Sequence, residues 1–274
     1  MRKRLLLAWM VIIALVICDA GNRDAMAITI DGGWTDWGIT VADDNNSLLT
    51  PGAGITSVIE DTNDLAPTNF YLGPGYGGQA CDVEALYSKI EGGYFYFAVV
   101  SGVRPDNGFS LYEPGDIVIT TDTAFYALET TGDRYNLTTS GYVASTTSTG
   151  SAGYLYEVTG TTTLGDGLIN WKDKTDNQDP VQLDSVSSNN LIENYGEFSY
   201  TGNDKTSQHS FMEGKIDMAL LNGWPTTVHF AVACGNDGLT VDVAPIPEPA
   251  TMLLLGTGLI CLAGLGRKKF NKGT

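Results

Sequence analysis

Short apolar runs alternate with turn-forming residues over most of the chain. The runs are rich in Val, Ile, Tyr and Phe, and clusters of Gly, Pro, Asn and Asp separate them. Long helical periodicity is absent from this central region, so the pattern predicts an all-β protein. The predicted strands are Asp82–Ser88, Tyr94–Val100, Asp116–Thr120, Phe125–Glu129, Tyr154–Val158, His209–Ile216, Thr227–Ala233 and Leu239–Val243.

Local patterns refine this prediction. Glu91-Gly92-Gly93 separates the first two strands and is typical of a hairpin turn. The strand Tyr94–Val100 is apolar at every position, which predicts a central strand buried on both faces. Asp217–Leu221 is expected to form one helical turn, and residues 140–151 a loop or a flexible hairpin. Many short strands within about 220 residues predict an antiparallel β-sandwich, of the jelly-roll or immunoglobulin-like type.

The N-terminus has the layout of a secretory signal peptide. Arg2, Lys3 and Arg4 precede an apolar stretch, Leu5–Ile17, and Ala25-Met26-Ala27 matches a small-x-small cleavage site. We therefore expect residues 1–27 to be removed on export, which leaves a secreted domain of residues 28–244. An earlier cut stays open, because the stretch before Ala25 is long and polar.

The C-terminus combines three features in a fixed order. Pro247, Glu248 and Pro249 precede an uncharged apolar run, residues 250–266, which predicts one transmembrane helix. A basic tail follows, which begins with Arg267, Lys268 and Lys269. Such a cluster favours the cytoplasmic side of the membrane for this end of the helix.

This order resembles the PEP-CTERM sorting signal of Gram-negative bacteria that make exopolysaccharide. The resemblance covers residues 245–274. It implies that exosortase, a membrane protease, processes the tail. It also implies a location at the cell surface, in the outer membrane or in the extracellular matrix. An ordinary C-terminal membrane anchor is the alternative.

Charge narrows the range of partners. The whole chain has a net charge of −17, with 15 basic and 32 acidic residues. The two terminal segments hold eight of the basic residues and three of the acidic ones, so the mature domain keeps seven basic and 29 acidic residues and a charge near −22. Nucleic acid and anionic lipid would be repelled. Divalent cations remain compatible with this charge.

Two of the four cysteines belong to the mature domain. Cys81 and Cys234 would meet an oxidising compartment after export, so a Cys81–Cys234 disulfide is predicted. Two free, buried thiols are the alternative.

Five blocks of sequence carry a second resemblance. They are Ile30–Trp37, Gly77–Tyr87, Tyr94–Val99, Gly115–Ile119 and Val228–Asp237. Their order resembles the DOMON-like β-sandwich superfamily, which includes family nine carbohydrate-binding modules. The resemblance implies an extracellular binding or structural module that is often directed at sugars, and hence polysaccharide as a partner.

Candidate binding residues have two interpretations each. Trp34 and Trp37 either stack on sugar rings or pack in the core. Asp173, Asp176 and Asp179 supply oxygen ligands suited to calcium, or form a solvated acidic turn.

Catalytic patterns are scarce in the sequence. It contains neither His-Glu-x-x-His nor Gly-x-Ser-x-Gly, and the two histidines, His209 and His229, lie in predicted strands where packing explains them. We expect a secreted, non-enzymatic protein of the surface or exopolysaccharide matrix, with a structural or carbohydrate-binding role. The alternatives are an extracellular polysaccharide hydrolase and a calcium-dependent adhesive protein.

Overall fold

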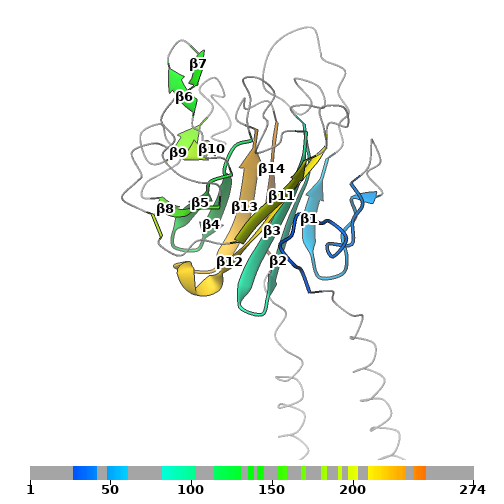
Figure 1. Cartoon of the computed structure of the whole chain (residues 1–274). Coiled ribbons are helices and arrows are strands. Elements are labelled where there is room, and N and C mark those ends of the chain that lie inside the picture. The colour runs from blue at the N-terminus through cyan, green and yellow to red at the C-terminus, as the bar shows by residue number, and fades with distance from the viewer. Residues whose placement is uncertain are drawn as a thin grey trace, which may run out of the picture. The chain divides into compact units, whose positions relative to one another are not determined.

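In a computed structural model, the regular elements of the described residues are almost all strands (Figure 1). The all-β prediction is confirmed, and each of the eight predicted strands is present with ends that differ by a few residues at most. The structure describes residues 27–41, 48–60, 82–102, 114–130, 135–138, 141–144, 153–158, 168–170, 180–183, 191–192, 197–202, 209–232 and 237–244.

Five antiparallel strands form the first sheet. Their order is β1-β2-β3-β12-β11, so the hairpin β2–β3 is joined by a strand from much later in the chain. The strands are β1 (Thr56–Ile59), β2 (Val83–Glu91), β3 (Tyr94–Ser101), β12 (Ser210–Asp217) and β11 (Glu197–Gly202).

A second antiparallel sheet also has five strands, in the order β14-β13-β4-β5-β8. They are β14 (Gly238–Asp242), β13 (Pro225–Ala231), β4 (Ile117–Thr121), β5 (Phe125–Leu128) and β8 (Leu155–Val158). Two further pairs stand apart from both sheets: β6 (Tyr135–Thr138) with β7 (Gly141–Ala144), and β9 (Leu168–Asn170) with β10 (Pro180–Leu183). Part of the predicted loop or hairpin at 140–151 is therefore a hairpin strand, β7.

One apolar cluster is shared by the two sheets. Phe95, Phe97 and Val99 alternate along β3 and belong to the same apolar cluster as Ile119 and Phe230 of the second sheet. Such alternation places every second side chain on the inner face of a strand. The structure therefore shows two antiparallel sheets packed on a common core; the jelly-roll or immunoglobulin-like type stays a prediction.

The predicted hairpin turn between β2 and β3 is confirmed. Glu91 pairs with Tyr94, which leaves a two-residue loop. Gly92 and Gly93 both have positive φ, 60° and 87°, as a type I′ turn requires. The predicted helical turn is also present, as the 3-10 helix Met218–Leu220, with Asp217 accepting a hydrogen bond from the Ala219 N–H at its start.

A second apolar cluster covers the outer face of the first sheet. Residues 27–41, here named the N-terminal segment, place Ile28, Trp37 and Ile39 against Tyr87 and Phe211 of that sheet. Strand β3 is consequently buried on both faces, as its uninterrupted apolar sequence predicts; only Tyr94, at its start, is exposed.

The chain divides into two compact units, residues 1–244 and 245–274. Within the described ranges, no helix is long and apolar enough to cross a membrane. The expected signal peptide up to Met26, the predicted helix at 250–266, and the residues proposed for sorting, disulfide formation and calcium binding lie outside those ranges.

Candidate functional site

The N-terminal segment is fixed to the first sheet by one carboxylate. Glu213 of β12 accepts hydrogen bonds at Oε1 from the backbone N–H groups of Asp31 (2.9 Å) and Gly32 (2.6 Å). Its Oε2 accepts a third, from Trp37 Nε1 at 2.7 Å. Asp31, Gly32 and Trp37 of the N-terminal segment therefore serve as a docking motif for this carboxylate.

Burial governs the ionisation of this carboxylate. Glu213 is 0% exposed, and desolvation raises its pKa from 4.5 to about 7, although the three hydrogen bonds act to lower it. The charge of Asp36 raises it further. A group whose pKa is raised in the folded state holds its proton longer there, so this contribution to stability falls as the pH rises from 4.5 to about 7.

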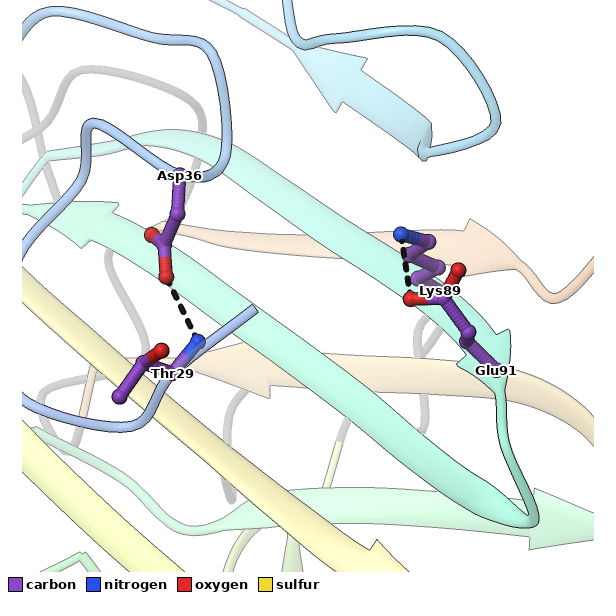
Figure 2. Close-up of polar contacts among 4 residues, drawn as sticks. All are labelled: Thr29, Asp36, Lys89 and Glu91. Carbon is purple, nitrogen blue, oxygen red and sulfur yellow. Dashed lines mark hydrogen bonds and ion pairs between the residues drawn. The ribbon is translucent and has the colours of Figure 1, made fainter. Parts of the chain in front are cut away.

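Asp36, in the same segment, uses only one of its carboxylate oxygens. Its Oδ2 accepts a hydrogen bond from the Thr29 N–H at 2.6 Å (Figure 2). Its Oδ1 is buried and has no hydrogen-bond partner. Neighbouring Asp31 is engaged locally, because its Oδ1 accepts from the Gly33 N–H at 2.7 Å.

The two tryptophans occupy different environments. Trp37 is 0% exposed, and its ring packs against Tyr87 and Phe211 at centroid distances of 6.1 and 6.4 Å. Trp34 is partly buried and meets Phe211 edge to face at 6.4 Å. The structure thus places Trp37 in the core and leaves only Trp34 with ring surface near solvent.

Beyond the N-terminal segment, the outer face of the first sheet carries tyrosines and lysines. Lys89, Tyr96 and Lys215 lie side by side on β2, β3 and β12. Tyr94, two residues before Tyr96, is 36% exposed, its ring 6.3 Å from that of Tyr96 and 5.1 Å from Lys215 Nζ. We name these four residues the tyrosine–lysine face.

Glutamates accompany both lysines of this face. Lys89 Nζ lies 2.8 Å from Glu91 Oε2, as Figure 2 shows, and Lys215 Nζ lies 2.9 Å from Glu197 Oε1. Across the described ranges, Lys89 and Lys215 are the sole Lys or Arg residues. Lys89 is 8% exposed and the Lys215 side chain 23% exposed, and each has a carboxylate partner, so the face gains no net positive charge.

A second buried polar group joins the two sheets at the end where β2 and β14 begin. Asp237 accepts from the N–H groups of Val83 (2.6 Å) and Gly238 (2.8 Å). Burial raises its pKa, whereas these bonds and one with the Asp82 side chain lower it. Two carboxyl groups that share a hydrogen bond must also share a proton, which explains how both can be buried.

Both histidines belong to polar pairs. His209 is buried just before β12, with Nε2 2.7 Å from Glu84 Oε1, and His229 in β13 has Nδ1 2.8 Å from Thr240 Oγ1. No group of three His, Cys, Asp or Glu residues positioned for a metal occurs within the ranges that the structure describes.

Sequence reasoning missed Glu213 and the tyrosine–lysine face. The alternation along the strand shows which side chains share a face with Glu213, but not whether that face is exposed to solvent or covered. Its hydrogen-bond partners precede it by about 180 residues. Lys89, Tyr96 and Lys215 become neighbours only through the pairing of β12 with β3. The two charged residues inside the predicted strand His209–Ile216, Glu213 and Lys215, were the available signal.

Comparison with known proteins identifies the tail. Residues 245–268 match the PEP-CTERM protein-sorting motif. No curated protein and no solved structure matches the chain. The resemblance to the DOMON-like superfamily is therefore not confirmed, whereas the sorting motif is. That motif indicates an exported protein, sorted by an exosortase to the surface or exterior of a Gram-negative cell.

Proposed function

We propose that this exported protein is a non-enzymatic matrix component whose tyrosine–lysine face binds polysaccharide. The observation that carries the proposal is the exposed Tyr94, whose ring lies 6.3 Å from that of Tyr96 and 5.1 Å from Lys215 Nζ. Tyr96 and Lys89 lie behind it and are largely buried, at 9% and 8% exposed.

The chemistry of this face suits sugar rings. Tyrosine offers a rigid apolar ring that buries the C–H surface of a sugar, while its hydroxyl keeps a polar contact. Two Lys–Glu pairs place ammonium donors and carboxylate acceptors beside the rings. Sugar hydroxyls both donate and accept hydrogen bonds, so alternating donors and acceptors are the matching lining.

Charge favours an uncharged polysaccharide. The mature domain has a net charge near −22, and both lysines of the face already have carboxylate partners. An acidic polymer would meet a repulsive field that the two paired lysines of this face do not offset. A neutral glycan avoids this repulsion.

The absence of catalysis is part of the proposal. Glu213 is the described glutamate whose pKa is raised most clearly, yet it is buried beneath the N-terminal segment and holds three structural hydrogen bonds. A general acid must reach the substrate oxygen that it protonates. This carboxyl cannot do so while the segment is in place.

Replacement of Tyr94 should abolish most of the binding. We expect Tyr94→Ala to weaken the affinity for a neutral glucan about tenfold, because a central aromatic contact is removed. Affinity electrophoresis of the exported protein in gels containing a neutral glucan or an acidic polymer measures this. Trp224→Ala is the matched control, since Trp224 is 39% exposed and lies before β13 of the other sheet. Equal retardation of wild type and Tyr94→Ala in every gel would contradict the proposed face.

Processing of the tail should depend on the Pro-Glu-Pro triplet. We expect replacement of Pro247, Glu248 and Pro249 by Ala to leave a full-length, cell-associated protein in a host that carries exosortase, because the residues that distinguish this tail from a plain anchor are gone. Intact mass of the cell-bound and released fractions reports the outcome. Identical processing of wild type and variant would show that the triplet is not read.

A further inference from the structure

One carboxylate oxygen of Asp36 accepts no hydrogen bond. Its Oδ1 is buried without a hydrogen-bond partner, while Oδ2 accepts from the Thr29 N–H. A buried acceptor left unmatched costs about 1–3 kcal/mol, and more when the group is charged. The folded mature protein should therefore contain a donor for this oxygen.

A candidate donor lies one residue from an existing bond. Thr29 N is 2.6 Å from Asp36 Oδ2, and the Ile28 nitrogen precedes it by three backbone bonds, a span of about 3–4 Å. The nitrogen of Ile28 is thus within reach of the same carboxylate. The Ile28 side chain is 6% exposed in the outer apolar cluster, so this end of the segment is anchored.

The local charge balance calls for a cation. Three carboxyl groups lie in this region: Asp31 and Asp36 of the segment, and Glu213 of β12. The nearby phenols of Tyr87 and Tyr96 stay uncharged, because burial raises their pKa values. The lysines of the described ranges contact Glu91 and Glu197 instead. Asp36 itself is partly buried, and its buried Oδ1 is an unmatched charged acceptor that a cation would satisfy.

We propose that signal-peptide cleavage after Ala27 supplies this cation: the new α-ammonium group of Ile28 donates to Asp36 Oδ1 and locks the N-terminal segment onto the first sheet. Before cleavage the Ile28 nitrogen is an uncharged amide. Removal of the signal peptide then completes the folded domain as well as releasing it. The proposal does not depend on polysaccharide binding.

The pH dependence of this lock follows from the titration of an α-amino group. An unpaired α-amino group has a pKa of about 7.7–8.0, and a carboxylate partner raises it in the folded state. The stabilisation is then fully present below about pH 7.7 and is lost as the pH rises through the higher folded-state pKa. The titration of Glu213 lies below this window, between 4.5 and about 7, so the two effects separate.

A one-residue extension tests the lock. One Ser is inserted between Ala27 and Ile28 of the full chain, so that the exported protein keeps its charge but carries its amino group one residue further out. Intact mass establishes each N-terminus. We expect the insertion to lower the Tm by about 4 °C or more at pH 7, with a smaller difference at pH 10. In an Asp36→Asn background the insertion should change little, whereas in the control Asp31→Asn it should still lower the Tm.

Three results would overturn the proposal. A mature wild-type chain that begins at a residue other than Ile28 removes the donor. Equal Tm values with and without the inserted Ser show that the position of the amino group is irrelevant. If the inserted Ser lowers the Tm of the Asp36→Asn variant as much as that of the wild type, the effect comes from displaced packing of Ile28 and not from the ion pair.

Discussion

Replacement of Glu213 by Ala should lower the Tm of the exported protein by about 10 °C. The substitution removes the acceptor of three hydrogen bonds, from Asp31 N, Gly32 N and Trp37 Nε1. Each buried donor left without a partner costs about 1–3 kcal/mol, and a domain of this size loses about 2–4 °C per kcal/mol. Thermal unfolding followed by tryptophan fluorescence suits the test, because the Trp37 indole is itself one of the donors.

A surface glutamate serves as the control for this substitution. Glu197→Ala removes the partner of Lys215, but the Glu197 side chain is 63% exposed, so we expect a change of about 0.5 kcal/mol or less. Glu213→Gln separates charge from packing, since Gln does not titrate. Relative to this variant, wild type should become less stable as the pH rises from 4.5 to about 7. Equal losses for Glu213→Ala and Glu197→Ala would refute the anchoring role.

The predicted Cys81–Cys234 disulfide has a comparably large expected effect on stability. The described neighbours of the two cysteines meet: Asp82 and Asp237 share a side-chain hydrogen bond, and the Val232 N–H donates to the Asp237 carbonyl at 3.0 Å. A bond that closes a loop of about 150 residues stabilises by about 4–5 kcal/mol in chain-entropy models. We therefore expect Cys81→Ser to lower the Tm by about 10 °C.

The pattern among cysteine variants distinguishes a disulfide from two thiols. Cys81→Ser, Cys234→Ser and the double variant should be equally destabilised, because breaking one bond removes it from both residues. Non-reducing peptide mapping of the exported protein should recover the two peptides as a linked pair. Quantitative alkylation of both thiols without reductant would show that no bond forms.

Local sequence patterns were sufficient for most of the fold. A strand is predicted by the alternation of Phe95, Phe97 and Val99 alone. The adjacent turn is predicted by the glycine pair at 92 and 93. Strand β1 (Thr56–Ile59) was missed because four residues give too short a period to recognise. Strand β11 (Glu197–Gly202) was missed because half of its residues are polar. It lies at the edge of the sheet, where polar side chains are common.

The sites depend on pairings that no local pattern contains. The sequence allowed Trp37 to lie at a sugar-binding surface or in the core. Its burial follows from the docking of its own segment on the first sheet, where Glu213 accepts a hydrogen bond from the indole. Lys89 and Lys215 are separated by more than a hundred residues and meet across β3. The sorting motif was recognised because all of its parts are contiguous.

The distance along the chain between Gly32 and Glu213 affects how the protein can fold during export. The two residues are separated by 181 positions, so if the chain crosses the membrane from its N-terminus, the docking motif emerges long before its acceptor. The hairpin β2–β3 has local contacts, but β3 must also wait for β12. Such non-local pairing is slow and leaves apolar strands exposed meanwhile. On that route the domain completes its folding only after nearly all of it has been translocated, which leaves chaperones beyond the membrane a long interval in which to act.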